Sequence, residues 1–418
     1  MNVLNEELME QMLTPENMSV AWRLVKANQG AAGIDGIGVG EFAAHISPHW
    51  ETIRTKVLEG RYKPAPVRRV YIPKGDGRQR PLGIPSVLDR LLQQAMLQVL
   101  QPHFEPLFSE HSYGFRPKRS AHDAVRAAQC FTAEGKDWVV DMDLKSFFDE
   151  VNHDILMSRV AQVIRDKRML QLIGRFLRGG VYEDGKVTKQ TKGVPQGGPL
   201  SPLLSNIYLD ALDKELESRG LSFCRYADDC NIYVGSKKSA ERVFRSVTTW
   251  IEKHLKVPVN YDKSDSGRPW NRQFLGYQPT EDGALKPSPK AMKKLKDRVR
   301  DFFSGRKSRT SKQLRDEWLR FIRGRCNYFA LADEIYWRKD ISGWIRRHIR
   351  KCFWLRWHSR KGRIRNLLKL GVRPWQIKKC HLYGASWPMS KHPVMHTALN
   401  NKTLKRYGFL TPSDLAVK

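Results

Sequence analysis

Two groups of acidic residues in this chain have the side chains and spacing that hold a divalent cation. Asp143 ends a short apolar segment, and Asp141 lies two residues earlier, on the same face of the expected strand. Asp228 and Asp229 form the turn of YADD between two apolar segments. Carboxylates at strand ends more often face a crevice than a core, and three together repel one another unless a cation offsets them. The alternative is a turn without metal, because Asp favours turns.

Oxygen ligands of this kind suit Mg²⁺, and Mn²⁺ substitutes for it at such sites. Two ions about 3.5–4 Å apart activate an attacking 3′-hydroxyl and stabilise a departing pyrophosphate. The sequence therefore predicts a two-metal catalytic site made of Asp143, Asp228 and Asp229.

Other segments carry side chains suited to a nucleoside triphosphate. Lys74 and Arg80 lie in a hairpin bounded by Pro and Gly, where two cations can clamp phosphates. In PQGGPLSP, the two glycines let a backbone approach a strand or a base closely, and Gln196 can hydrogen-bond a nucleotide or template. Phe148 is a candidate for excluding a ribose 2′-hydroxyl. The alternatives are that Lys74 and Arg80 lie in a solvated basic turn, that Gln196 lies in an ordinary Gly/Pro loop, and that Phe148 is a core aromatic. For Phe147 we expect the core position.

Positive charge is concentrated in the last third of the chain. The net charge is +31, and residues 287–418 contribute +26 of it, with 34 Lys and Arg against 8 Asp and Glu. Self-repulsion of this size opposes folding, so its usual explanation is a polyanionic partner. Nucleic acid is the expected partner, and a membrane surface is the minor alternative.

The segment WIRRHIRKCFWLRWHSRKGRIR (344–365) alternates aromatic with basic side chains. Basic groups neutralise phosphates and aromatic rings stack on bases, so this segment is predicted to bind nucleic acid. In the alternative interpretation, Trp344, Phe353, Trp354 and Trp357 pack inward on an amphipathic helix, and we expect both interpretations to hold. The predicted contact residues are Arg346, Arg347, Arg350, Lys351, Arg356, Arg360, Lys361, Arg363 and Arg365.

The apolar periodicity indicates which elements position these residues. The N-terminal 60 residues read as helices interrupted by a Gly-rich loop, and the part after residue 287 reads as almost wholly helical. Between them we expect strands at 67–72, 138–143, 222–225 and 230–234, and helices at 86–100, about 152–178 and after the turn near 192–210. The boundaries are expected near residues 60, 286 and 360.

The six cysteines form no CxxC pair, which excludes a zinc ribbon and fits a reducing compartment. The N-terminus has no signal-peptide pattern, and no run of about 18 apolar residues predicts a membrane span. We therefore expect a cytoplasmic protein associated with ribonucleoprotein or nucleoid.

Taken together, these motifs resemble the group II intron reverse transcriptase/maturase family, in the family's order along nearly the whole chain. The matching segments are NQGAAGIDG (28–36), KGDGRQRPLGIP (74–85), SYGFRPKRSAHDA (112–124), VDMDLKSFFD (140–149), GVPQGGPLSPLLSNIYLD (193–210), RYADD (225–229) and FLGY (274–277). YADD alone would be weak, but an ordered set of this length is highly specific.

The resemblance implies an α+β right-hand polymerase with fingers, a ferredoxin-like palm and a helical thumb, followed by a small basic helical segment. The implied domains are 1–60 (N-terminal extension), 61–286 (fingers and palm), 287–360 (thumb/maturase) and 361–418 (basic DNA-binding segment).

By the same resemblance, each candidate residue has an implied role. Asp143 and Asp228 match the principal metal ligands, and Asp229 completes the triad. Phe148 matches the sugar gate, Lys74 and Arg80 the triphosphate clamp, and Gln196 the loop that lines the nucleotide and template site. Lys263, in NYDKS, matches a lysine that protonates the leaving pyrophosphate.

The implied activity is RNA-directed DNA synthesis with two Mg²⁺ ions, deoxynucleoside triphosphates, a DNA or RNA primer and an RNA template, together with intron RNA binding, splicing and retromobility. The alternatives are a splicing maturase whose polymerase has decayed, and a domesticated enzyme acting in DNA repair or defence. Two departures are visible: Arg325 stands where relatives usually carry Trp, and the absence of a C-terminal Cys/His cluster suggests the endonuclease-lacking type.

Overall fold

The computed structural model describes residues 7–73, 77, 79–304, 309–380, 382 and 386–415. The chain divides into two compact units, Met1–Arg268 and Pro269–Lys418. The boundary that the sequence suggested near residue 286 falls inside the second unit. Lys74 lies outside the described residues. Within the described part, no helix has the length and apolar character needed to cross a membrane.

The first unit begins with short helices, of which the first two pack on a longer central one. They are α1 (Leu8–Met12), α2 (Pro15–Asn28), α3 (Phe42–Ile46) and α4 (Trp50–Leu58). Helix α2 packs along α5 (Val87–Phe104), the central helix. The side chains of Thr14 and Ser86 accept hydrogen bonds from backbone N–H groups in the first turns of α2 and α5, which explains where these two helices start. The predicted helices and Gly-rich interruption are both present.

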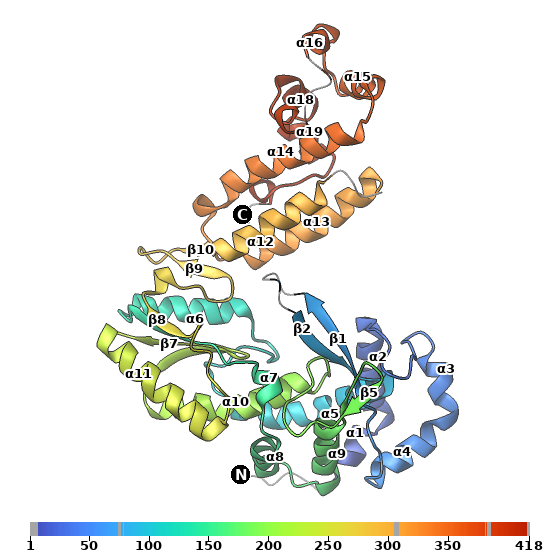
Figure 1. Ribbon diagram of the computed structural model, residues 1–418, viewed down its shortest axis with the longest axis vertical. Helices are drawn as coiled ribbons and strands as arrows, with labels where there is room; N and C mark the ends of the chain where they lie inside the picture. The colour runs from blue at the N-terminus through green and yellow to red at the C-terminus, as the bar shows by residue number, and fades with distance from the viewer. Residues whose placement is uncertain are drawn as a thin grey trace. The chain divides into compact units, whose positions relative to one another are not determined.

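A four-stranded sheet follows, with the strand order β2-β1-β4-β5. Its strands are β1 (Val67–Pro73), β2 (Gln79–Ile84), β4 (Val181–Glu183) and β5 (Lys186–Thr188). Strands β1 and β2 form the predicted antiparallel hairpin, with Arg68 opposite Ile84 and Ile72 opposite Arg80. This register places Arg80 near the end of the hairpin, which Figure 1 shows extending away from the helices of the first unit.

The second sheet of this unit carries the acidic motifs. It is antiparallel, with the order β6-β7-β3-β8, and consists of β3 (Trp138–Met142), β6 (Ser222–Tyr226), β7 (Asp229–Val234) and β8 (Asp265–Gly267). Helices α6 (Ala121–Ala133), α10 (Ser201–Ser218) and α11 (Lys237–Trp250) pack against it (Figure 1). In the two inner strands Met142 of β3 pairs with Cys230 of β7, so Asp143, just beyond β3, and Asp229, at the start of β7, lie at the same end of the sheet.

Two helices replace the single long helix expected over residues 152–178. Helix α7 (Phe147–Glu150) leads into α8 (His153–Val163), and α9 (Lys167–Arg178) follows a break. The carboxylate of Asp166 caps α9 by accepting from Arg168 N and Met169 N, and its second oxygen accepts from Met9 N at 3.1 Å. The prediction was wrong here because a contact with the distant N-terminus decides where the break lies.

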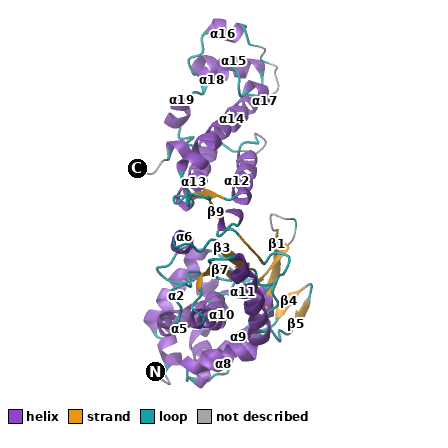
Figure 2. Cartoon of the chain, turned by 90° about the vertical axis from the view of Figure 1, so that its left-hand side faces the viewer, coloured by secondary structure: helices purple, strands orange, loops and turns teal. Residues whose placement is uncertain are grey.

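The second unit is mostly helical (Figure 2). A short hairpin of β9 (Tyr277–Pro279) and β10 (Leu285–Pro287) precedes its helices. The helices are α12 (Pro289–Phe302), α13 (Ser311–Tyr328), α14 (Arg338–Arg356), α15 (Arg360–Lys369), α16 (Pro374–Lys378), α17 (Ser386–Met389), α18 (Pro393–Ala398) and α19 (Asn401–Arg406). Its core is aromatic: Trp318, Trp337 and Trp354 are fully buried, and the Trp318 ring lies 4.9 Å from that of Phe303.

Candidate active site

The hairpin of β6 and β7 presents Asp228. Tyr226 pairs with Asp229, which leaves Ala227 and Asp228 as a two-residue turn. Ala227 has a positive φ of 58°, a conformation unusual for a residue other than Gly. Asp228 is half-buried, whereas Asp229 is exposed. The turn must therefore be held by contacts that overcome its local preference.

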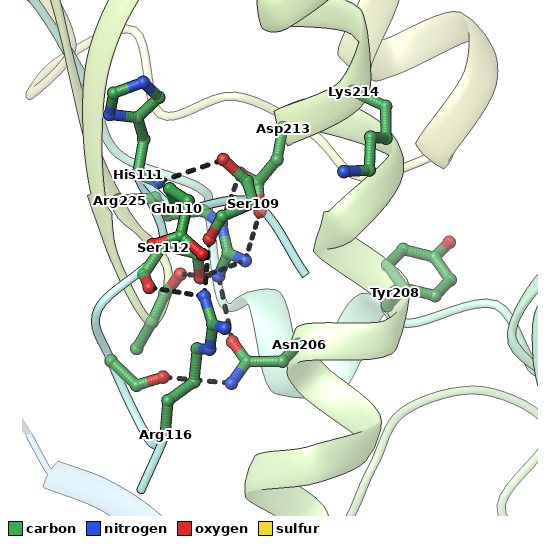
Figure 3. A network of polar contacts seen from close by, with 12 residues as sticks. Ser109, Glu110, His111, Ser112, Arg116, Asn206, Tyr208, Asp213, Lys214 and Arg225 are labelled. Carbon is green, nitrogen blue, oxygen red and sulfur yellow. Dashed lines mark hydrogen bonds and ion pairs between the residues drawn. The ribbon is translucent and has the colours of Figure 1, made fainter. Parts of the chain in front are cut away.

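A fully buried arginine supplies these contacts (Figure 3). The Arg225 guanidinium is 0% exposed, and its Nε donates to Asp213 Oδ1 at 2.7 Å. Its Nη1 donates to the Ala227 carbonyl at 2.9 Å and to Asn206 Oδ1 at 3.0 Å, and Nη2 donates to Ser112 Oγ at 2.7 Å. A buried charge is stable only when it is paired and hydrogen-bonded, so the network fixes the backbone of the turn before Asp228.

The loop 111–116 lies along β6 and contacts the same turn. Tyr113 N donates to the Arg225 carbonyl at 2.8 Å, and Arg225 N donates to the His111 carbonyl at 2.9 Å. A Cβ on Gly114 would lie 2.2 Å from Ala227 N, so this position requires Gly. Asn206 Nδ2 holds the Gly114 carbonyl at 2.9 Å. The sequence-based prediction gave no role to this network, although an Arg within the apolar segment before YADD was a visible signal.

Different contacts hold Asp143, just beyond the end of β3. Asn260 Nδ2 donates to Asp143 Oδ2 at 2.7 Å, and Lys263 Nζ lies 3.1 Å from the same oxygen. The backbone N–H of Asp143 donates to Ser264 Oγ at 2.8 Å. Lys263, predicted from the sequence, therefore contacts a predicted metal ligand, while Asn260 and Ser264 were not predicted.

The structure brings Asp143, Asp228 and Arg80 into one electrostatic environment. Burial raises the pKa of Asp228 above its usual range, and the Asp143 carboxylate raises it further, whereas Arg80 lowers it. Arg80 Nε also donates to Gln196 Oε1 at 2.7 Å. Two residues predicted to bind a nucleotide thus contact each other beside the acidic pair.

The loop that carries Gln196 is clamped to β2. Gly83 N donates to the Gln196 carbonyl at 2.8 Å, and a Cβ on Gly197, whose φ is 128°, would lie 2.5 Å from the Gly83 carbonyl oxygen. The sequence predicts that the glycines allow close approach to a strand or a base, and in this structure the loop approaches strand β2.

Phe148 and Phe147 are both buried, and their ring centroids are 5.3 Å apart. Phe147 also packs near Tyr208 at 6.1 Å, in agreement with the core position expected for it. The Phe148 carbonyl accepts from Val194 N at 2.6 Å, which ties this residue to the loop that carries Gln196.

The donor set at this site fits a hard divalent cation. Two carboxylates converge, one of them half-buried with a raised pKa, and an ammonium group lies beside the other. In the described part of the chain, no three His, Cys, Asp or Glu side chains already lie together as a ready-made metal site.

The predicted nucleic-acid contacts in the second unit differ in exposure. Arg347, Arg360, Lys361 and Arg365 are exposed, whereas Arg350 is buried and donates to the Leu399 carbonyl at 2.9 Å. Four others are half-buried: Arg346, Lys351, Arg356 and Arg363. Arg346, Arg356 and Arg363 also donate to Thr411 Oγ1, the Arg309 carbonyl and the Leu382 carbonyl, respectively. The placement of Arg350 favours a structural role.

Comparisons with known proteins agree with the motifs. The family model "Reverse transcriptase (RNA-dependent DNA polymerase)" matches residues 72–279, and "Group II intron, maturase-specific domain" matches residues 292–371. Protein YkfC of Escherichia coli (strain K12) is 35% identical over 300 residues, which cover 62% of this chain and 78% of YkfC. Group II intron-encoded protein LtrA of Lactococcus lactis subsp. cremoris is 29% identical over 425 residues, which cover 78% of this chain and 70% of LtrA.

Among solved structures, a partial Cas6-RT-Cas1–Cas2 complex matches with a TM-score of 0.39 and 24% identity, over 59% of this chain and 42% of that one. The predicted α+β right-hand polymerase fold is confirmed, with two sheets in the first unit and a helical second unit. The two family models match in the expected order, and YkfC is similar over most of its length. The chain therefore belongs to the group II intron reverse transcriptase/maturase family.

Proposed function

We propose that this protein is an RNA-directed DNA polymerase that extends a DNA or RNA primer with deoxynucleotides along an RNA template. The observation that carries the proposal is the convergence of Asp143 and Asp228 beside Arg80 and Gln196. A surface that only bound RNA would gain nothing from two carboxylates aimed at a polyanion, whereas a polymerase needs them to hold cations.

Asp143 and Asp228 would hold the two Mg²⁺ ions, with Asp229 as the third ligand. When bound, the ions supply the charge that lowers the pKa of the primer 3′-hydroxyl and neutralises the departing pyrophosphate. The Arg225 network fixes the backbone of the Asp228 turn, so that little reorganisation is needed when a cation binds.

The remaining predicted residues fit the nucleotide side of the same reaction. Arg80, held by Gln196, offers its remaining N–H groups to a triphosphate, and Lys74 is proposed to join it. Phe148 is proposed as the sugar gate, because its backbone links the acidic motif to the Gln196 loop. Lys263, already 3.1 Å from Asp143, is proposed to protonate the leaving pyrophosphate.

Primer extension with oligo(dT) on poly(rA) tests the polymerase. Asp228→Ala and Asp143→Ala should lower the rate by about a thousandfold or more, since each removes a ligand whose charge is worth several kcal/mol. Asp184→Asn is the matched control, because Asp184 lies in the turn between β4 and β5, outside the acidic pair. Equal rates for wild type and Asp228→Ala would contradict the proposal.

The match of residues 292–371 to the maturase-specific domain favours a second activity in the same chain. We propose that the basic second unit binds structured group II intron RNA, assists its splicing and supports retromobility. Its charge of +26 over residues 287–418 predicts that affinity falls steeply with salt, on the order of a thousandfold between 50 and 200 mM for six or more phosphate contacts.

Filter binding of intron RNA at a series of salt concentrations measures this effect. Replacement of exposed Arg347, Lys361 or Arg365 by Gln should each reduce the slope of log affinity against log salt by about one. A flat salt response in the wild-type protein would contradict RNA binding by this unit.

A further inference from the structure

Phe115 has an unusual conformation for an aromatic residue. Its φ is +59°, in the left-handed region that strongly favours Gly, and its side chain is 47% exposed. Folding gains nothing from an apolar ring in water, and the backbone pays a conformational penalty to put it there. Such outliers persist where the surrounding structure enforces them, and they cluster at binding and catalytic sites.

Close packing and hydrogen bonds fix the chain on both sides of Phe115. Before it, Gly114 packs on Ala227 and its carbonyl accepts from Asn206 Nδ2. After it, the buried Arg116 guanidinium donates to the carbonyls of Ser109 and Ser112 (Figure 3). It also donates to the Glu105 carboxylate at 2.8 Å. Phe115 therefore cannot relax without disturbing the network that also holds Arg225.

The backbone that carries the ring is next to the turn that presents Asp228. Gly114 touches Ala227, and Ala227 directly precedes Asp228. In the part of the chain that the structure describes, no aromatic ring or cation packs on the Phe115 ring. Three residues further, exposed Lys118 adds a positive charge to the same loop. An exposed ring and a nearby cation are the pair that recognises a nucleic-acid strand.

We propose that Phe115 packs against the base at the 3′ end of the primer and so holds the terminal nucleotide at Asp228. This inference rests on the proposed polymerase function, because the primer end is the part of the substrate that must approach the metal ligands. Base–aromatic packing does not depend on sequence, as an enzyme that extends any primer requires.

Binding measurements test the contact without requiring catalysis. Fluorescence anisotropy with a labelled RNA template and DNA primer, in the absence of divalent metal, should show about tenfold weaker binding for Phe115→Ala. Phe115→Gly should weaken binding equally but raise Tm by roughly 1–3 °C, because Gly adopts the positive φ without strain. Leu107→Ala, which removes another exposed apolar side chain near this loop, should leave affinity unchanged.

A primer with an abasic 3′-terminal nucleotide distinguishes packing of Phe115 on the terminal base from a general loss of primer affinity in the variant. The wild type should lose affinity on this primer, down to the level of Phe115→Ala, and the variant should lose little more. An equal loss in both proteins, or wild-type affinity of Phe115→Ala for the intact primer, would overturn the inference. Failure of the polymerase proposal would look different, since wild type and Asp228→Ala would then extend primers equally whatever the binding data show.

Discussion

Asp228 is held through the backbone of its turn by a buried ion pair, whereas the Asp143 carboxylate itself is held by side chains that water can reach. On the Asp228 side, Arg225 and Asp213 are both fully buried, and the arginine binds the turn through a carbonyl group. On the Asp143 side, the Lys263 side chain is 50% exposed and binds the carboxylate itself. Arg225 therefore sets the geometry of the Asp228 turn, whereas Lys263 occupies a carboxylate oxygen of Asp143 that a cation would use.

The difference suggests that Asp228 and Asp143 differ in how freely they can move. A buried ion pair is costly to break, so the Asp228 turn stays in place whether or not a cation is bound. An exposed lysine exchanges partners at little cost, so under the proposed function Asp143 would leave Lys263 for a metal ion as the substrate arrives. We infer that the site combines a rigid ligand with an adjustable one.

The largest effect is expected from breaking the buried pair. Asp213→Ala leaves the Arg225 charge buried without its counter-ion and should lower the free energy of unfolding by about 3–5 kcal/mol. The double variant Arg225→Met/Asp213→Leu should recover much of that stability, but not activity, because the Ala227 carbonyl has lost its donor. Urea denaturation together with primer extension measures both. Full activity in the double variant would mean that the network has no positioning role.

A smaller effect is expected at Asp89, a buried carboxylate that forms no ion pair with any of the described residues. It accepts from Tyr62 Oη, Ala65 N and Ser86 Oγ, yet burial raises its pKa to about 6 from 3.8. The raised pKa means that its stabilising contribution is complete below pH 3.8 and is lost as the pH rises through 6, by about 3 kcal/mol in all.

Urea denaturation of wild type and Asp89→Asn between pH 4 and pH 8 checks this. The wild type should lose stability relative to the variant as the pH rises, since Asn does not ionise. Parallel stability curves would show that this carboxylate remains ionised in the fold. Together, the Asp213 and Asp89 variants compare how a buried carboxylate contributes to stability when it has a counter-ion and when it has none.

The smallest effect on stability is expected at Lys263. Lys263→Met should change the free energy of unfolding by less than about 1 kcal/mol, because half-exposed ion pairs contribute little. If the lysine protonates pyrophosphate, the rate of primer extension should still fall by about a hundredfold or more. Single-turnover rates across pH measure this, and an unchanged pH profile would argue against proton donation.

Much of the fold was predictable because it depends on local patterns. Strands β1, β3, β6 and β7, helix α5 and the helical second unit lie where the apolar periodicity indicated. The break between α8 and α9 was not predictable, because it depends on Asp166 reaching Met9 across the fold. The exposure of the basic residues also escaped prediction: Arg350 resembles its neighbours in the sequence, but it is buried against the Leu399 carbonyl.

The sequence by itself determined which residues can do chemistry: the acidic motifs, the basic charge of the last third and the ordered motifs of the family. Only the tertiary structure decided how they are held. Arg225 is a buried residue that binds the Ala227 carbonyl, Gly114 packs against the turn before Asp228, and Lys263 contacts the Asp143 carboxylate. The physical reason is that side-chain type is local, whereas burial, pairing and backbone strain depend on segments far apart in the chain.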